Sequence, residues 1–374
     1  MKLCMIGAGY VGLVSGTCFA DIGNQVICVD KNLDKINKLK SGICPIYEPG
    51  LSELIKKNYL AKRLFFSSDV KKAINSSDII FICVGTPTKK GSLDVDLSYV
   101  FKSCKEILKH TKKKKILVTK STVPVGTGDN IENYLKKKKK LFTIISNPEF
   151  LREGEAIRDF RYPDRIVIGS NEKKAFNTMR KLYSPLINKG SKFFKTSRRG
   201  AELIKYASNA FLATKITFVN ELANLCEKSG VNIEDISLGM GSDSRIGGRF
   251  LRAGPAYGGS CFPKDTKGLV STAKKYKINL SVVKSVIKSN SDRVNLLIRR
   301  IDKILGRNLK NKKISFLGVT FKPNTDDMRD STSLKMIPYL SKKGALINYY
   351  DPSGEKKELK KIKNCFFKKN IMSN

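Results

Sequence analysis

A cysteine in the middle of the chain lies between a glycine turn and two charged residues. Residues 258–265 read Gly-Gly-Ser-Cys-Phe-Pro-Lys-Asp. Glycines let the backbone come close to a ligand, and a cation such as Lys264 favours the reactive thiolate of Cys261. The only histidine is His110, so a Ser-His-Asp triad or a Cys-His pair would have to include it. Cys261, with Lys264 and Asp265 nearby, is therefore the best candidate for covalent chemistry.

The chain begins with a dinucleotide-binding turn. Residues 7–12 read Gly-Ala-Gly-Tyr-Val-Gly, follow an apolar strand and open a helix. Gly7 makes the tight turn, Gly9 lets a pyrophosphate approach, and Gly12 packs the helix against the strand. Asp30 follows eighteen residues after Gly12, where it binds ribose hydroxyls and repels a 2′-phosphate, so NAD is preferred over NADP. The alternative is a structural turn without a cofactor. A hydride acceptor and a carbonyl-holding cysteine together indicate oxidation of an alcohol through an aldehyde to an acid.

Further polar segments follow predicted strands, at 84–88, 120–127 and 147–154. Residues beyond the carboxyl ends of parallel strands line the ligand crevice, although ordinary strand exits and a capped helix start explain these segments equally simply. Lys205 and Asn209 are one helical turn apart and predict an oxyanion or hydroxyl clamp. The alternative for Lys205 is a surface lysine in a salt bridge.

The elements that position these residues predict an α/β protein. Apolar strands at 2–6, 25–30, 79–84, 116–120 and 143–146 alternate with helical stretches, which is typical of a parallel, doubly wound Rossmann-type sheet. We expect this domain to cover residues 1–195. Residues 196–305 form a central domain with a long helix over 199–227, short helices after the cysteine, and a second long helix over 280–304. A polar linker at 306–313 leads to a second, Rossmann-like domain over 313–374, with strands at 314–319 and 346–350 and an acid, Asp351.

Composition narrows the classes further. The sequence has no run of about 18 apolar residues, so we expect no membrane span. Its nine cysteines are scattered and form no Cys-x-x-Cys pattern, which favours reduced thiols in the cytoplasm over disulfides or a metal site. The formal charge of +39 comes from lysines spread along the chain, so we expect a solvated surface that attracts anionic substrates and no nucleic-acid partner.

Taken in order, these segments resemble the UDP-glucose/GDP-mannose dehydrogenase family. The cysteine segment is the most specific part, and its Phe-Pro-Lys-Asp ending favours the UDP-glucose branch. The resemblance covers residues 1–352 and rests on the glycine turn with Asp30, residues 121–127, residues 147–154, the helix with Lys205 and Asn209, residues 250–265 and residues 321–331.

The resemblance implies a four-electron oxidation in which UDP-glucose, two NAD and water give UDP-glucuronate and two NADH. Cys261 adds to the aldehyde as a thiohemiacetal, and a thioester is then hydrolysed. Lys205 and Asn209 stabilise the oxyanion. Asp265, with a threonine and an ordered water, handles protons, and Glu149 assists hydrolysis; which carboxylate is the hydrolytic base stays open. The implied catalytic residues are Cys261, Lys205, Asn209, Asp265, Glu149 and Thr122.

The resemblance also implies binding residues, a cytoplasmic homodimer built on the 199–227 helix, and a product used in polysaccharide biosynthesis. Arg245 is expected to reach the substrate of a neighbouring subunit; the alternative is one more solvated basic residue. The implied cofactor-binding residues are Gly7, Gly9, Tyr10, Val11, Gly12, Asp30, Lys35, Thr86, Thr122, Glu153, Lys264 and Arg329. The implied substrate-binding residues are Glu149, Phe150, Leu151, Arg152, Glu153, Lys205, Asn209, Arg245, Phe250, Leu251, Arg252, Ala253, Gly254, Gly258 and Lys322.

One departure from the family concerns the C-terminus. Family members usually continue for some tens of residues past Asp351, whereas residues 356–374 are polar, lysine-rich and contain no evident further strand. We therefore expect an incomplete C-terminal domain that is the least stable part of the chain. The alternatives are a dehydrogenase of GDP-mannose or a UDP-N-acetylhexosamine, a non-catalytic NAD-binding paralogue, and a charge-driven nucleic-acid binder.

Overall fold

The computed structural model describes residues 1–306 and 308–371. The chain divides into two compact units, residues 1–206 and 207–374, and each is described by itself. Position 307 of the predicted linker and positions 372–374 of the predicted C-terminal domain lie outside the described residues.

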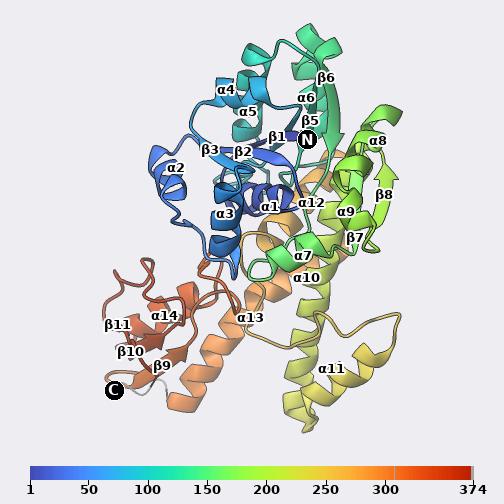
Figure 1. Cartoon of the computed structure of the whole chain (residues 1–374). Helices are drawn as coiled ribbons and strands as arrows, with labels where there is room; N and C mark the ends of the chain where they lie inside the picture. The colour runs from blue at the N-terminus through green and yellow to red at the C-terminus, as the bar shows by residue number, and fades with distance from the viewer. Residues whose placement is uncertain (307, 372–374) are drawn as a thin grey trace. The chain divides into compact units, whose positions relative to one another are not determined.

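The first unit is built on an eight-stranded sheet in the order β3-β2-β1-β4-β5-β6-β7-β8 (Figure 1). All neighbours pair in parallel except β6 and β7, whose single antiparallel register pair is Ser146 with Gly169. The predicted doubly wound parallel sheet is thus confirmed. Its strands are β1 (Lys2–Ile6), β2 (Gln25–Val29), β3 (Leu64–Ser67), β4 (Ile79–Ile82), β5 (Lys115–Thr119), β6 (Phe142–Ser146), β7 (Arg165–Gly169) and β8 (Lys192–Thr196).

Helices cover both faces of this sheet because the side chains of a strand alternate between its two faces. In β1, Leu3 and Met5 join one buried cluster, and Cys4 and Ile6 join the other. The first cluster includes residues of α1 (Tyr10–Asp21), α2 (Leu33–Lys40), α3 (Leu51–Leu60), α7 (Ala156–Arg161), α8 (Lys173–Leu182) and α9 (Ser184–Ile187). The second includes residues of α4 (Val70–Ser76), α5 (Ser98–His110) and α6 (Thr127–Tyr134), and a short 3₁₀ helix spans Lys136–Leu141.

The long central helix is a single element, α10 (Arg198–Ser229), one or two residues longer at each end than predicted. In the second unit it is followed by α11 (Ile233–Ser242), α12 (Phe262–Lys275) and α13 (Ser281–Leu305). The expectation of short helices after the cysteine is wrong, since α12 is one continuous helix of 14 residues. Pro263 falls in its first turn, where a missing N–H costs nothing.

The C-terminal sheet has three parallel strands in the order β11-β10-β9. These are β9 (Lys313–Leu317), β10 (Leu346–Tyr350) and β11 (Cys365–Phe367), and α14 (Ser333–Lys342) connects the first two. The third strand corrects the prediction that residues 356–374 contain no further strand. Its three residues are too short and too close to lysines for the alternation of a strand to be visible in the sequence. The sheet and α14 share a buried core that includes Val319, Ile337, Leu340 and Ile347.

Candidate active site

The turn after β1 has the geometry that a dinucleotide requires. Gly7 has φ +101°, and a Cβ at Gly12 would lie 1.9 Å from the Gly7 carbonyl oxygen, so neither position accepts a side chain. Nothing lies within 4 Å of a Cβ placed at Gly9, which leaves room for a pyrophosphate. Among the described residues no side chain caps the first turn of α1, so its amides stay available to an anion.

Asp30 lies directly after β2 and faces this turn. Its carboxylate accepts hydrogen bonds from the Ala8 N–H and the Asn32 N–H, each at 3.0 Å, and from the Lys35 ammonium, also at 3.0 Å. Burial alone would raise the pKa of Asp30, but the Asn32 amide and Lys35 hold it below its usual value. Asp30 therefore stays charged beside the place of a ribose. Lys35, an implied cofactor residue, lies in the same corner.

The exits of β4 and β5 are tied together. The Thr86 hydroxyl donates to the Thr122 carbonyl oxygen at 2.8 Å, and the Ser121 hydroxyl donates to the Val84 carbonyl oxygen at 2.7 Å. Both exits lie at the carboxyl edge of the sheet, as do Gly7 and Asp30. The predicted cofactor residues of the first unit therefore lie along one edge.

Glu149 and Lys205 form a buried ion pair within the first unit. Lys205 Nζ lies 3.4 Å from Glu149 Oε1, and the two side chains are 4% and 7% exposed. The second oxygen of Glu149 accepts the Leu151 N–H at 2.6 Å, and Nζ of Lys205 also lies 5.2 Å from the centre of the Phe150 ring. The alternative of a surface lysine is thus wrong, because Lys205 is buried against a carboxylate.

The rest of the 149–154 segment is held by local contacts. The Arg152 guanidinium and amide both bind Asp159, at 2.6 to 2.9 Å. Gly154 has φ +83°, and its N–H donates to Glu48 at 2.6 Å. Glu153, next to Gly154, is half-buried. This segment is therefore fixed as a turn between β6 and α7 and not as an extension of either.

The cysteine turn of the second unit packs against the loop that follows β9. A Cβ at Gly258 would lie 2.4 Å from the Asp330 carbonyl oxygen, and one at Gly259 would lie 2.7 Å from the Phe321 ring. The Gly259 N–H donates to the Arg329 carbonyl oxygen at 2.8 Å. Cys261 follows as the N-cap of α12, where the positive end of the helix dipole favours a negative charge.

One turn behind Cys261, Asp265 is fully buried at the centre of a polar cluster. Its Oδ2 accepts the Asn209 side-chain amide at 2.6 Å, and its Oδ1 lies 2.5 Å from the Lys264 ammonium. The Asp265 N–H donates to the Cys261 carbonyl oxygen at 2.8 Å. Asn209 therefore orients Asp265 instead of pointing alone at a ligand.

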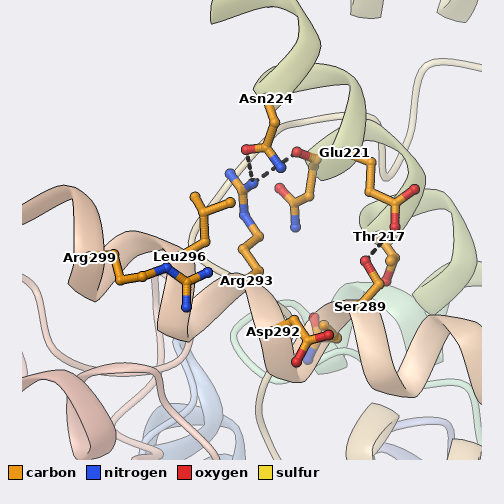
Figure 2. A pocket seen from close by; sticks show the side chains of 10 residues that line it. Thr217, Glu221, Asn224, Ser289, Asp292, Arg293, Leu296 and Arg299 are labelled. Carbon is orange, nitrogen blue, oxygen red and sulfur yellow. Dashed lines mark hydrogen bonds between the residues drawn. The ribbon is translucent and has the colours of Figure 1, made fainter.

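The 250–254 segment is supported from behind by α10 and α13. The Gly254 N–H donates to Asn220 Oδ1 at 2.8 Å, and the Arg293 guanidinium donates to the Gly254 carbonyl oxygen at 2.5 Å. Figure 2 shows Arg293 in a pocket of about 220 Å³ between these helices, reaching Asn224 at 3.1 Å. No predicted site residue lines this pocket within the described chain. Phe250 has φ +66°, a strained value for a residue with a side chain, and its ring packs against that of Phe262 with the ring centres 6.2 Å apart.

Two of the predicted residues, Arg245 and Arg329, are exposed. Arg245 pairs with Asp243 at 2.6 Å and its side chain is 88% exposed. Arg329 pairs with Asp327 at 2.7 Å. Lys322 is half-buried and lies in the loop that follows β9, five residues after the end of that strand.

The acid after β10 repeats the arrangement at Asp30. Asp351 accepts the Val319 N–H at 2.9 Å, as Asp30 accepts the Ala8 N–H at 3.0 Å. Gly318 donates to the last residue of β10 at 2.8 Å, as Gly7 donates to the last residue of β2. The second, Rossmann-like domain therefore repeats the turn geometry of the first.

Sequence reasoning missed several residues that hold the site. Lys120 is buried and lies 3.4 Å from Asn147 Oδ1 and 3.3 Å from the Tyr183 hydroxyl, and its burial lowers the pKa to about 8. Glu202 of α10 accepts the Gly126 and Gly128 N–H groups at 2.7 and 2.8 Å. The only available signal was charge within otherwise apolar segments, which does not reveal the partner.

Comparison with known proteins agrees with this geometry. Residues 1–187, 199–292 and 315–373 match the NAD binding domain, the central domain and the UDP binding domain of the UDP-glucose/GDP-mannose dehydrogenase family. The chain belongs to this family. The resemblance seen in the sequence is thereby confirmed.

Relatives within the UDP-glucose/GDP-mannose dehydrogenase family cover nearly the whole chain. The UDP-glucose 6-dehydrogenase of Rhizobium meliloti is 50% identical over 95% of this chain and 82% of that protein. The UDP-glucose 6-dehydrogenase TuaD of Bacillus subtilis is 47% identical over 94% of this chain and 76% of that protein. A solved UDP-glucose dehydrogenase of Pyrobaculum islandicum superposes with a TM-score of 0.93 at 34% identity, covering 98% of this chain and 86% of that one.

Two searches of the described residues gave no further site. No helix there is long and apolar enough to span a membrane. No group of three or more His, Cys, Asp or Glu side chains in that part of the chain is arranged to hold a metal ion.

Proposed function

We propose that this chain oxidises UDP-glucose to UDP-glucuronate with two NAD, one water and release of protons. The observation that carries the proposal is the cluster around Cys261: a cysteine at the start of α12, one turn ahead of a buried Asp265 held by Asn209 and Lys264. A nucleophile beside an oriented carboxylate suits a reaction that forms and then hydrolyses an acyl adduct. The similarity to UDP-glucose 6-dehydrogenases supports the choice of substrate.

The proposed roles follow from these contacts. NAD, when bound, accepts hydride from C6. The Cys261 thiolate adds to the aldehyde as a thiohemiacetal, and after the second oxidation it is the leaving group when water hydrolyses the thioester. Asp265, held in place by Asn209 and Lys264, accepts the proton of the reacting hydroxyl, with the help of Thr122 and an ordered water that the family resemblance implies.

The buried pair of Glu149 and Lys205 has complementary proposed roles. The Lys205 ammonium stabilises the developing oxyanion, and the Glu149 carboxylate accepts a proton from the hydrolytic water. The remaining binding residues keep the roles that the family resemblance implies.

We also propose the finer assignments of domain and assembly. Residues 1–195 bind NAD, 196–305 form the central cysteine domain, and 313–374 bind UDP. The enzyme is a cytoplasmic homodimer through the 199–227 helix, which presents Leu203, Phe211, Phe218 and Leu225 as exposed apolar side chains seven or eight residues apart. Such a stripe suits a helix-helix contact. The acid then serves polysaccharide biosynthesis.

The test is an NADH-formation assay that counts NADH per sugar consumed. UDP-glucose, GDP-mannose and a UDP-N-acetylhexosamine are compared at equal concentration, and the acid is identified by mass spectrometry. We expect two NADH per UDP-glucose and the highest kcat/KM for that sugar. Preference for another sugar would reassign the substrate, and NAD binding without turnover would support the non-catalytic paralogue.

A further inference from the structure

A buried carboxylate joins two segments of the first unit that are far apart in sequence. Glu48 lies in the turn before α3 and is 6% exposed. Its Oε1 accepts the Ala156 N–H at 2.7 Å, and its Oε2 accepts the Gly154 N–H at 2.6 Å. The Tyr10 hydroxyl donates to the same Oε2 and lies 3.2 Å from the Gly154 nitrogen. Both oxygens of Glu48 are therefore engaged.

The two segments joined by Glu48 face different ligands under the proposed function. Tyr10 is the first residue of α1 and directly follows Gly9, where the pyrophosphate enters. Gly154 ends the 149–154 segment, to which the nucleotide sugar is assigned. Tyr10 and Gly154 are 144 residues apart. The hydrogen bonds of Glu48 to Tyr10, Gly154 and Ala156, here called the Glu48 bridge, consequently connect a cofactor segment to a substrate segment without passing through the sheet.

The bridge is built to stay closed. Burial raises the pKa of the Tyr10 phenol, and the Glu48 carboxylate adds to that rise, so Tyr10 remains a hydrogen-bond donor. Bonds from N–H and O–H groups to a carboxylate are roughly twice as strong as neutral ones. A displacement of Tyr10 on cofactor binding therefore moves Glu48 and, with it, the turn at Gly154.

We propose that Glu48 is a positioning residue that couples the glycine turn at 7–12 to the 149–154 segment, so that NAD and the nucleotide sugar bind interdependently. The proposal rests on the proposed function for the identity of the two ligands. Coupling between sites is reciprocal and typically changes affinity by about 5- to 150-fold. The predicted residue is thus a determinant of cooperativity between substrates and does not touch the reacting atoms.

The experiment measures the Kd of UDP-glucose by calorimetry with and without saturating NADH, which cannot oxidise the sugar. In wild type we expect NADH to change this Kd by roughly fivefold or more. Glu48→Gln keeps the side-chain volume but turns an N–H₂ group toward the backbone N–H groups, so the ratio should fall to within about twofold of one. Tyr10→Phe, which removes the hydroxyl that contacts Glu48 and Gly154, should reduce the ratio in the same direction. Glu53→Gln, an exposed acid five residues away, is the matched control.

A second readout separates this proposal from the choice of substrate. Amide hydrogen exchange at Gly154 and Ala156 is measured with and without NADH alone. Protection by NADH in wild type that is lost in Glu48→Gln supports the coupling even if UDP-glucose does not bind, in which case only the proposed function fails. The coupling is overturned if Glu48→Gln has the same Kd ratio as wild type or the same protection by NADH. It is also overturned if NADH does not change the Kd of UDP-glucose in wild type. If Glu48→Gln does not fold, the same two outcomes in Tyr10→Phe decide.

Discussion

The side-chain amide of Asn209 donates a 2.6 Å hydrogen bond to Asp265, and both residues are buried. The neutral amide of Asn209 binds one carboxylate oxygen of Asp265, and the Lys264 ammonium lies beside the other. A carboxylate held in this way has one orientation, which a general base requires before a substrate arrives. Asn209 therefore fixes the orientation of Asp265.

Asp265→Asn tests this base. The change keeps the shape of the side chain but removes its charge and places the new amide against that of Asn209. Because an amide cannot accept the proton, kcat should fall by roughly 10²- to 10⁴-fold. Stability should fall by about 1–3 kcal/mol, the usual cost of an unsatisfied buried polar group. Steady-state NADH formation and thermal unfolding measure the two effects. Asp326→Asn, an exposed acid of the same unit, should change neither; near-normal kcat in Asp265→Asn would exclude Asp265 as the base.

Cys261→Ser should stop net formation of the acid. An alkoxide is a far poorer leaving group than a thiolate, so any ester that forms is hydrolysed slowly, and intact-mass spectrometry should detect the adduct. Cys44→Ser, a change at another partly buried thiol, should alter turnover by no more than a few-fold. Turnover close to wild type in Cys261→Ser would remove the thiol from the mechanism.

Asp30→Ser should narrow the preference for NAD over NADP. The substitution removes the acceptor for the ribose hydroxyls and leaves the Lys35 ammonium, 3.0 Å from the former carboxylate, able to meet a 2′-phosphate. The ratio of kcat/KM for the two cofactors is the measurement, and Asp34→Ser at an exposed position is the control. Equal use of both cofactors by the unmodified chain would contradict the assignment.

Lys205→Ala should depress kcat by roughly 10²-fold or more, the typical worth of one oxyanion donor. Stability should fall as well, because removing one partner of the buried pair with Glu149 leaves a buried charge unpaired, which typically costs about 3–5 kcal/mol. Lys205→Arg should recover much of the stability but not kcat, and Lys228→Ala on an exposed face of α10 is the control. Normal kcat in Lys205→Ala would limit the residue to a structural role.

Glu202 should make stability depend on pH near neutrality. Burial raises its pKa from 4.5 to about 7, and Asp129 adds to the rise against the opposing amide hydrogen bonds. The folded state thus binds this proton more tightly than the unfolded state does. Its contribution to stability is full below pH 4.5, falls as pH rises to about 7, and is constant above.

The measurement compares thermal unfolding of wild type and Glu202→Gln between pH 4.5 and 8. The stability difference, wild type minus variant, should fall with rising pH by roughly 3 kcal/mol at most. Glu53→Gln, exposed in α3, should run parallel to wild type. A difference that stays flat would mean that folding does not shift the pKa of Glu202, and one that rises with pH would mean that folding lowers it.

Prediction from sequence succeeded where local pattern decides the structure. The strands β1 and β10 and the extent of α10 follow from apolar runs and helical spacing, and the glycine turn follows from steric need. It failed for β3, β7 and β8 of the first sheet and for β11 of the second. The sequence of β8 contains two lysines and β11 has three residues, so both depend on pairing with a neighbouring strand more than on their own composition.

The same division holds for the site. The types of Cys261, Asp30 and Asp265 indicated their chemistry, but their partners come from other elements. That Lys205 is buried against Glu149, across 56 positions of sequence, could not be read from either segment. Glu48 escaped notice for the same reason, since its three donors lie at positions 10, 154 and 156.

Because Gly258 packs directly against Asp330, the cysteine turn and the loop of the UDP binding domain constrain each other's position. Under the proposed function, contacts made by a uridine diphosphate far from C6 would then help to hold the thiol of Cys261 in position. Binding energy from the nucleotide, which does not react, would in this way help to position the groups that act on C6. A sugar without its nucleotide would accordingly lose turnover at saturation, and not merely affinity.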